Sequence, residues 1–503
     1  MEISDDDFDD LLLFRHLIPR LLPNRVRDPL HLIFEQSLAS DDDSSSSSEE
    51  IFAEIKKGSL GESSSNERNT YGENGEKSSM NIWKCIQRRE LGLGPHSSTG
   101  FSEHEKSRVF SKYLPNTVTE VIKHHAKVFS GHYSQDGSVF MSASQDCHIK
   151  LYETGRGHLR EFQDVVALNV GWSVVDTAYS HDQRHLIYSS WSPNLYLCDI
   201  AGGCEKGQVA LDMRPAGPSF CAFSIKFSQD DREILTGSNE GGLYIYDRGC
   251  EKRTLRINGH SDDVNAVCFC DNTSQLLFSA ADDGLCKVWD RRTLNEHRPE
   301  PVGVFAGHVC GLGGVDSKGD GRYLITSSKD QTIKLWDMRR FTDADGMREG
   351  VMAVAKNQYW DYRWEGVPKR FQRDTKLKGD VSVMTYRGHS FLRCLIRARF
   401  SPVETTAQNF IYTGSADGCI YIYDLNSGMI VSRLQGHNDV IRDVSWHPSR
   451  PCMMSSSWDQ TVKCWEYSRD KEETERSDKE IAEDERDERA RKRYPSQKYF
   501  FRN

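Results

Sequence analysis

One short phrase returns along this chain: a Gly-His pair, a stretch of alternating strand-like sequence, and then an aromatic residue followed by an acid. Four plain copies run from Gly259 to Asp290, Gly307 to Asp337, Gly388 to Asp424 and Gly436 to Glu466. A regular period made of short strands is typical of a ring of β-sheets, in which each repeat supplies one blade. The phrase therefore predicts an all-β fold for most of the chain.

Three further copies, in which the opening and closing pairs are incomplete, lie at about 125–153, 170–199 and 218–247. A second feature aligns the copies, because a turn residue precedes the closing aromatic residue at a fixed distance, as Asp283 precedes Trp289. An Asp-Gly pair at this position, present in two copies, suits a tight hairpin between two strands. Seven blades are therefore expected.

The Gly-His start and the Trp-Asp end resemble those of the WD-repeat family. The resemblance implies a seven-bladed WD-repeat β-propeller over 116–467. The segment 116–123 has the composition of an outer strand but precedes the first blade, and no outer strand follows Trp465. We therefore expect 116–123 to complete the seventh blade, which closes the ring and leaves no open sheet edge.

A His, an Asp and a Ser or Thr recur in the blades, and nucleophilic catalysis uses this set of residue types. The set returns with the repeat, however, and the resemblance implies a hydrogen-bonded link from the turn aspartate to the tryptophan, which satisfies buried polar groups. We interpret His260, Asp283 and Trp289 as scaffold. The sequence has no phosphate-binding glycine loop, HExxH motif or metal-ligand spacing, so we expect no enzyme, no metal and no cofactor.

Charge and hydropathy exclude several classes of partner. The chain has 503 residues and a net charge of -10, so it offers no basic surface for nucleic acid. No apolar run approaches the ~20 residues of a membrane span, and the acidic segment 1–10 is unlike a signal peptide. The fourteen cysteines lack paired CxxC spacing, which favours reduced thiols. We expect a protein of the nucleus and cytoplasm, with Arg491-Lys492-Arg493 as a weak nuclear-entry patch.

The segments outside the ring differ in character. Residues 1–79 are acidic and Ser-rich, and we expect them to be largely disordered around a short amphipathic helix at 9–22. That helix either binds a partner or packs on the propeller. Residues 80–115 carry two helical patterns, the second opened by a capping box at Ser102, and predict a helix-loop-helix. The charged tail, 468–503, is expected to be a solvated helix or disordered.

Two consecutive blades end in the same pattern, Trp289-Asp290-Arg291-Arg292 and Trp336-Asp337-Met338-Arg339. An arginine that projects from a blade end offers a planar fork of donors, suited to carboxylates or carbonyls on a partner. The pattern resembles that of the substrate receptors of cullin-4 RING ubiquitin ligases, which dock on the ligase's damage-binding adaptor. Wider stretches, such as Asp443 to Pro448, are similar to the eleventh-member branch of the cullin-4-associated factor family and its plant relatives, over about 82–467.

The resemblance implies a substrate-recognition subunit whose partners are the adaptor, cullin-4 and a protein substrate that the sequence does not identify. It implies adaptor contacts from the helix-loop-helix and from the arginine-bearing blade ends. The candidate adaptor-binding residues are Trp289, Asp290, Arg292, Trp336, Asp337, Arg339, Ile82, Trp83, Ile86, Val109 and Phe110. Two alternatives stay open: the helices pack only on the propeller's own edge, and the chain is a WD-repeat scaffold with no ligase link.

A long insertion, 341–386, interrupts the link between the fifth and sixth blades. Its length exceeds that of an ordinary loop, which indicates function or disorder. It carries aromatic residues beside arginine, a combination that is favoured at interfaces. The candidate substrate contacts are Tyr359, Trp360, Tyr362 and Trp364. The alternative is that these side chains pack against the outer strands of blades five and six.

Overall fold

The structure is a computed structural model that describes residues 103–155, 159–200, 207–214, 220–373 and 376–470. The predictions for 1–79, for the first helix of the helix-loop-helix and for the tail beyond 470 lie outside the described residues. Within the described residues, no helix is both long and apolar enough to span a membrane.

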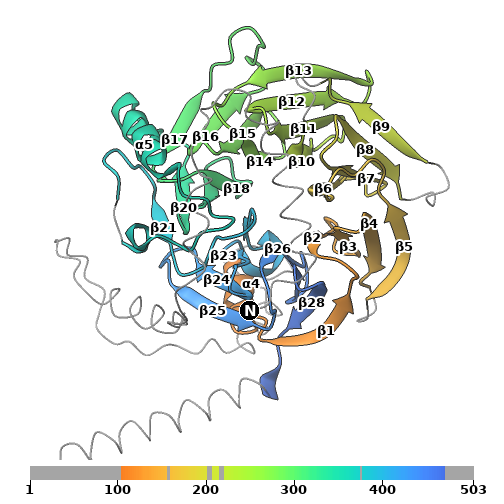
Figure 1. The fold of residues 1–503 in the computed structure, drawn as a ribbon. Coiled ribbons are helices and arrows are strands. Elements are labelled where there is room, and N and C mark those ends of the chain that lie inside the picture. The colour runs from red at the N-terminus through yellow and green to blue at the C-terminus, as the bar shows by residue number, and fades with distance from the viewer. Residues whose placement is uncertain (1–102, 156–158, 201–206, 215–219, 374–375, 471–503) are drawn as a thin grey trace, which may run out of the picture.

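Seven four-stranded antiparallel sheets form the blades of a ring, with the first strand of each blade at the centre (Figure 1). The predicted seven-bladed propeller is confirmed. From the centre outward, blades 1 to 3 are β2 (Val128–Tyr133), β3 (Val139–Ser144), β4 (His148–Glu153) and β5 (Arg160–Val166); β6 (Asp176–Tyr179), β7 (His185–Ser189), β8 (Asn194–Asp199) and β9 (Gln208–Asp212); β10 (Ala222–Phe227), β11 (Glu233–Ser238), β12 (Gly242–Asp247) and β13 (Lys252–Asn258).

The second half of the ring follows the same order. Blades 4 to 7 are β14 (Val264–Phe269), β15 (Leu276–Ala281), β16 (Leu285–Asp290) and β17 (Gly303–Ala306); β18 (Leu312–Ser317), β19 (Tyr323–Ser328), β20 (Thr332–Asp337) and β21 (Met384–Tyr386); β22 (Ala398–Phe400), β23 (Phe410–Thr413), β24 (Cys419–Asp424) and β25 (Ile430–Gln435); β26 (Ile441–Trp446), β27 (Met453–Ser457), β28 (Thr461–Glu466) and β1 (Thr117–Lys123). The helical segments are α4 (Glu103–Phe110), α5 (Ala344–Asn357), the 3-10 turn η3 (Lys369–Gln372) and α6 (Val403–Thr406).

The hydrophobic core is divided among the contacts between blades. Each of seven buried clusters draws its side chains from two neighbouring blades. Leu235 of blade 3, for example, shares a cluster with Leu277 and Trp289 of blade 4. Because a sheet must bury its apolar faces against another layer, every blade depends on both of its neighbours.

The ring is closed by a strand from the N-terminal side of the propeller. β1 pairs antiparallel with β28, from Thr117 opposite Glu466 to Lys123 opposite Thr461. The expectation that 116–123 completes the seventh blade is confirmed. Ile122 also packs against the buried cluster between blades 7 and 1, so β1 both covers a sheet edge and contributes to the core.

The recurring polar set forms the predicted core link. In blade 4, Nδ1 of His260 lies 2.8 Å from Oδ2 of Asp283, and its Nε2 lies 2.7 Å from Oγ of Ser279. Nε1 of Trp289 donates to the same Oγ at 2.8 Å. Blades 5 and 7 repeat the link with His308, Asp330, Thr326 and Trp336 and with His437, Asp459, Ser455 and Trp465.

Two blades vary this link. In blade 1 the histidine that faces the core is His124, whose Nε2 lies 3.2 Å from Oγ of Ser142, whereas His125 is exposed. In blade 6 the closing residue is Tyr423, and its hydroxyl lies 3.0 Å from Nδ1 of His389. A phenol reaches the histidine directly, so no intermediate hydroxyl is needed.

The insertion lies inside blade 5, between its third and fourth strands, and not between two blades. The segment 384–386 is β21, the outer strand of that blade, and Tyr386 stands opposite Ile333 of β20. The expectation that 341–386 links blades five and six is therefore wrong. The Gly-His pair of the next repeat follows β21, so the sequence repeat and the structural blade are out of phase by one strand.

Helix α5 carries the insertion along the outside of the ring, beside β17 (Figure 1). The carboxylate of Asp343 caps it by accepting from the backbone N–H of Gly346 at 2.8 Å. Gly350 lets the helix approach blade 4, because a Cβ there would lie 2.9 Å from Cβ of Ala306. The helix is thus fixed on the neighbouring blade.

Candidate functional site

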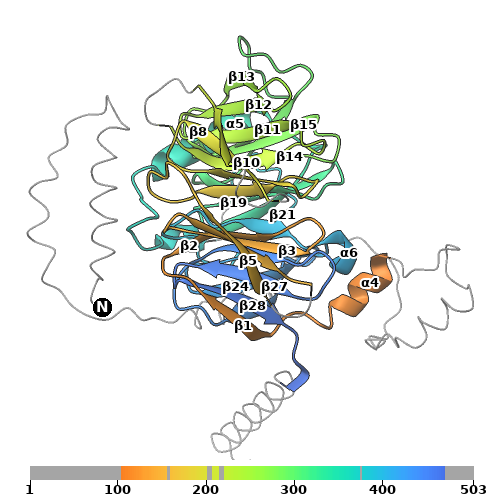
Figure 2. The same cartoon turned by 90° about the vertical axis from the view of Figure 1, so that its right-hand side faces the viewer.

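The antiparallel course of each blade sorts its connections between two faces of the ring. The connections from first to second strand and from third to fourth strand lie on one face, which we call the fork face; it includes Asp290–Arg292, Asp337–Arg339 and α6. The turns from second to third strand and the links between blades lie on the opposite face, which we call the cavity face. Figure 2 shows the ring edge-on, with α4 and α6 on one side.

Asp290 and Arg292 form a fork at the end of blade 4. Nε of Arg292 donates to Oδ1 of Asp290 at 2.9 Å, and Nη2 donates to Oδ2 at 2.7 Å. The backbone N–H of Arg292 also donates to Oδ1, at 2.9 Å. Asp337 and Arg339 repeat the fork in blade 5, with distances of 3.0 Å and 2.6 Å. Part of each guanidinium is therefore already bound by the chain's own carboxylate.

The forks are fixed, ionised and exposed. Hydrogen bonds from Arg292 lower the pKa of Asp290 to about 2, and those from Arg339 hold the pKa of Asp337 well below its usual range. The arginine side chains are 68% and 64% exposed. Because a guanidinium has five N–H groups, each fork still presents donors to the solvent, in an orientation that the carboxylate holds.

Trp289 and Trp336 belong to the scaffold and not to the surface. Their exposed fractions are 0% and 1%, because each indole N–H is used in the core link. The prediction that these two residues contact an adaptor is therefore wrong, since a partner cannot touch them in the folded ring. Asp337 is also buried, and its carboxylate holds both Arg339 and Arg322.

The second helix of the predicted helix-loop-helix is α4, and it lies at the edge of the fork face. It contacts α6, and Nδ2 of Asn409 donates to Oγ of Ser107 at 2.5 Å. Val109 and Phe110 are partly buried. Packing on the propeller's own edge is therefore observed for this helix, and a partner can still reach part of both side chains.

The remaining helix candidates, Ile82, Trp83 and Ile86, lie outside the described residues. Their predicted contact with the adaptor stays a prediction.

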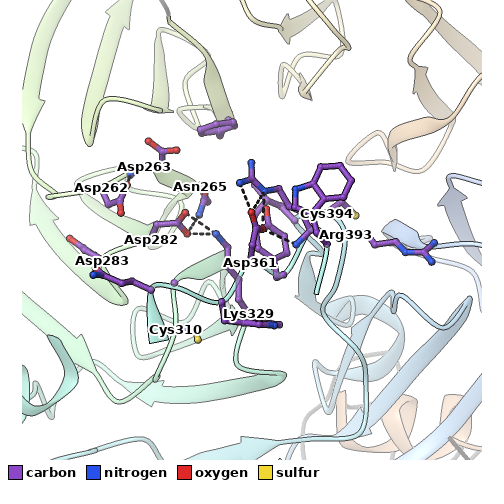
Figure 3. Close-up of a pocket in the computed structure, with 18 of the residues that line it drawn as sticks. Asp262, Asp263, Asn265, Asp282, Asp283, Cys310, Lys329, Asp361, Arg393 and Cys394 are labelled. Atoms are coloured by element: carbon purple, nitrogen blue, oxygen red, sulfur yellow. Dashed lines mark hydrogen bonds and ion pairs between the residues drawn. The ribbon is translucent and has the colours of Figure 1, made fainter. Parts of the chain in front are cut away.

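The cavity face holds a hollow of about 970 Å³ that all seven blades help to line (Figure 3). One part of its wall is aromatic and comes from blades 1, 2, 3 and 7. These side chains are Phe129, Trp172, Trp191, Phe223 and Trp458.

Another part of the wall is acidic and comes from blade 4. Asp282 binds Nζ of Lys329 at 2.7 Å and Nδ2 of Asn265 at 2.6 Å. Burial, with the carboxylates of Asp282 and Asp262 close by, raises the pKa of Asp263 to about 8. Among the residues that the structure describes, no base forms an ion pair with Asp262 or Asp263. The hollow is thus acidic at blade 4.

The insertion reaches the hollow after α5 ends. Nδ2 of Asn357 donates to the carbonyl of Val309 at 2.9 Å, which fixes the end of the helix on the cavity face. Of the four predicted aromatic contacts, Trp360, Tyr362 and Trp364 line the hollow. Tyr359 does not line it and is 87% exposed.

The packing of these side chains differs from the alternative that the sequence left open. Tyr362 lies against Phe391, with ring centroids 6.0 Å apart, and Nζ of Lys329 lies 4.3 Å from its ring centre. Trp360 packs edge-on against Phe371 of η3, at 5.1 Å. The ring contacts of Tyr362 and Trp360 are therefore made toward the hollow and within the insertion. Substrate contact by this segment stays a prediction.

A third fork lies in the insertion and was not expected. Nε and Nη2 of Arg363 donate to the two carboxylate oxygens of Asp361 at 2.9 Å and 2.7 Å. Trp360-Asp361-Tyr362-Arg363 has the same spacing as the two blade ends, although it belongs to no blade. The spacing itself was the available signal, because the same Asp-x-Arg spacing gives a fork at both blade ends.

The floor of the hollow is a network of buried charges. Nη1 of Arg397, beside the first strand of blade 6, lies 2.8 Å from Oδ1 of Asp176 in blade 2, across the centre of the ring. Nη2 of Arg399 lies 2.8 Å from Oδ1 of Asp443 in blade 7. Arg442 donates to backbone carbonyls of blades 1 and 2. The Arg397–Asp176 pair thus joins two distant blades across the ring, and the other bonds join blade 7 to blades 1, 2 and 6.

An enzyme built on this fold would need a polar cluster in the channel, and this network is such a cluster. Burial alone would raise the pKa of Asp176, but the charges of Arg397 and Lys226 and a hydrogen bond from Arg397 lower it to about 2. Asp176 and Asp443 are fully buried, and each is bound to an arginine. The network therefore supports the ring. Because Asp176 and Asp443 are each bound to an arginine, neither carboxylate is available as a base. In the described part of the chain, no group of three or more His, Cys, Asp or Glu could hold a metal ion.

Comparisons with known proteins agree with the repeats. A family model described as WD domain, G-beta repeat matches residues 116–153, 250–290, 299–337, 380–424 and 428–466. The LEC14B protein of Lithospermum erythrorhizon is 41% identical over 399 residues, which is 77% of this chain and 82% of that protein.

Two nematode proteins are similar over a comparable length. The DDB1- and CUL4-associated factor 11 homolog of Caenorhabditis elegans is 39% identical over 373 residues, 72% of this chain and 64% of that protein. The homolog of the same name from Caenorhabditis briggsae is 36% identical over 396 residues, 76% of this chain and 69% of that protein.

Proposed function

The chain belongs to the family of WD-repeat proteins that contains the plant LEC14B proteins and the nematode DDB1- and CUL4-associated factor 11 homologs, and from this we propose that it is a substrate-recognition subunit of a cullin-4 RING ubiquitin ligase. In this role the chain does not itself transfer ubiquitin. It docks on the ligase's DDB1 adaptor and presents a protein substrate to the ligase.

The observation that carries the proposal is the pair of similar forks on neighbouring blades. Arg292 and Arg339 lie on one face of the ring, are fixed by Asp290 and Asp337, and keep N–H donors exposed. Arginines held in this way lose little side-chain entropy when a partner binds. They suit carboxylates or carbonyls at the rim of an interface.

Helix α4 supplies the apolar side of the same surface. It lies on α6, on the face that carries the forks, and its partly buried Val109 and Phe110 offer apolar contact area. Interfaces are commonly built with apolar anchors inside a polar, charged rim. The fork face combines both kinds of group, which supports it as the docking surface.

The test is affinity capture of DDB1 and cullin-4 by the full chain beside an Arg292→Ala, Arg339→Ala double variant. We expect the variant to capture at most about one tenth of the DDB1 that the parent captures, because two fixed charge-assisted contacts are lost. Thermal melting of both proteins shows whether the variant is folded. The carboxylates still accept the backbone N–H groups of their turns, so we expect the fold to persist.

A matched control is the Arg298→Ala, Arg340→Ala double variant. Both arginines are exposed and lie in the same two connections of the fork face, but the structure records no ion pair for either of them. This variant removes the same charge and should capture DDB1 as the parent does. If the parent captures no DDB1, the ligase proposal is wrong and a WD-repeat scaffold remains. Equal capture by parent and fork variant would contradict the forks as the docking contacts.

A further inference from the structure

The acidic part of the hollow is concentrated at the link between blades 3 and 4. We call Asp262 and Asp263 the acid corner (Figure 3). Both side chains line the hollow, and Oδ1 of Asp262 accepts only the neighbouring backbone N–H of Asp263, at 3.0 Å, among the bonds that the described residues record for these carboxylates. Two adjacent carboxylates in a hollow repel each other unless a cation is present.

Three of the bases around the hollow are bound to other carboxylates, whereas Arg442 donates to backbone carbonyls and Lys127 lies over the ring of Trp458. Lys329 is bound to Asp282 at 2.7 Å, and Arg393 is bound to Asp439 at 2.8 Å. The arginine of the third fork is bound to its own aspartate. These three cations are therefore used elsewhere. Asp263, whose pKa is raised to about 8, is largely protonated at neutral pH, and an incoming cation would favour its ionised form.

Apolar side chains line the same hollow as the acid corner. Toward blade 3, Phe223 and Trp191 form an edge-to-face pair, with centroids 5.9 Å apart, that lines the hollow. Toward the insertion, Val351 and Val354 of α5 line it. Val354 sits on the turn of blade 4, where a Cβ at Gly284 would lie 2.3 Å from its Cγ2. A cation that enters the corner therefore has apolar walls beside it.

We propose that the hollow binds an extended peptide segment in which a Lys or Arg side chain enters the acid corner and an adjacent apolar side chain lies against Phe223 and Trp191. This inference rests on the proposed function, because it names the class of substrate segment that the receptor presents. The hollow of about 970 Å³ is at the upper end of the range for small-molecule pockets, roughly 300–1,000 Å³. It holds a few extended residues and excludes a folded domain.

The charge and the walls also decide between classes of ligand. Nucleic acid is disfavoured, because its phosphates would meet the carboxylates of blade 4. A wholly apolar ligand would leave the acid corner without a counter-charge. A peptide with a basic and an apolar residue side by side satisfies both, and the aromatic rings add a favourable face for its cation.

The test uses the purified full chain without any ligase component. A display library of random, end-capped peptides is selected on the parent chain, and the best peptide is then titrated by fluorescence anisotropy. We expect selected peptides to be enriched in Lys or Arg next to an aromatic or aliphatic residue. We expect the Asp262→Asn, Asp263→Asn double variant to bind the best peptide roughly tenfold more weakly or worse, since the carboxylates that would pair with the basic side chain are removed.

Two controls separate the acid corner from net charge and from folding. Asn keeps an oxygen that can accept the backbone N–H of residue 263, and thermal melting checks that the variant is folded. The Glu300→Gln, Glu404→Gln double variant removes two exposed carboxylates from the fork face and should bind the peptide as the parent does. Replacing the basic residue of the peptide by Gln should weaken binding to the parent but not to the acid-corner variant.

Several results would overturn the inference. They are selection of no peptide, selection of peptides without a basic residue, and equal affinity of the best peptide for the parent and the folded acid-corner variant. Because no adaptor is present, any of these can occur while DDB1 capture succeeds. Conversely, peptide binding at the acid corner with no DDB1 capture would retain the binding site and remove the ligase role.

Discussion

Ser279 shows how much one side chain does in this ring. Its Oγ lies 2.7 Å from Nε2 of His260 and 2.8 Å from Nε1 of Trp289. The indole can only donate, so the hydroxyl accepts from it and donates to Nε2 of a neutral histidine. Burial lowers the pKa of His260 despite the adjacent Asp283, which keeps the ring in that neutral form. A single hydroxyl thus satisfies two buried ring nitrogens.

We predict that Ser279→Ala destabilises the protein by about 2–4 kcal/mol, because both ring nitrogens then lack a partner and each buried unsatisfied group costs about 1–3 kcal/mol. Urea denaturation, followed by tryptophan fluorescence, measures the loss. Ser279→Thr is the matched control, since Thr326 makes the same link in blade 5, and it should cost less than about 1 kcal/mol. Equal stability of the Ala and Thr variants would show that the hydroxyl contributes nothing.

Residue spacing singled out the recurring polar set and the blade-end arginines, but it did not predict the acid corner. The recurrence indicated a scaffold role for the polar set, and the resemblance to the WD-repeat family implied the core link. The forks were only partly predicted, since a sequence does not show whether Arg292 binds its own aspartate or a partner. Asp262 and Asp263 resemble any solvated acidic pair until the ring brings the links of seven blades around one axis.

At the scale of elements, β1 and the insertion show opposite outcomes. β1 was predictable because a closed ring requires a fourth strand in every blade, and the sequence after Trp465 turns into a charge run where an outer strand would be expected. The insertion was misplaced because the repeat begins at the Gly-His pair, after the outer strand of the preceding blade. An insertion before Gly388 therefore belongs to blade 5, where it separates β20 from β21 in the sequence. The path of α5 along blade 4 had no signal in the repeat.

Deletion of 116–123 should destabilise the whole ring and not only blade 7. The deletion exposes the edge of β28 and part of the cluster between blades 7 and 1, and each blade depends on both neighbours. We predict a fall in Tm of roughly 10 °C or more, measured by differential scanning calorimetry. Deletion of 2–8, a segment of similar length outside the propeller, is the control and should leave Tm unchanged. A lowered first transition with an unchanged main transition would contradict cooperative closure.

The whole molecule separates two surfaces by the thickness of the ring. The forks and α4 lie on one face, and the hollow with the insertion lies on the other. Between them stand the inner strands and the buried ion pairs that join blades 2, 6 and 7. Densely packed interiors of this kind resist continuous deformation, so a contact on one face has no evident route to alter the other.

We therefore predict that binding on the two faces is independent. The fork variant, Arg292→Ala with Arg339→Ala, should weaken DDB1 capture and leave peptide affinity unchanged, while the acid-corner variant, Asp262→Asn with Asp263→Asn, should do the reverse. In the combined variant the loss of affinity for each partner should equal, within about 0.5 kcal/mol, the loss in the single-face variant, measured by titration of each partner alone and in the presence of the other. Coupling must be equal in both directions. If saturating peptide changes DDB1 affinity tenfold, the ring is a conformational switch and not a rigid spacer between two independent faces.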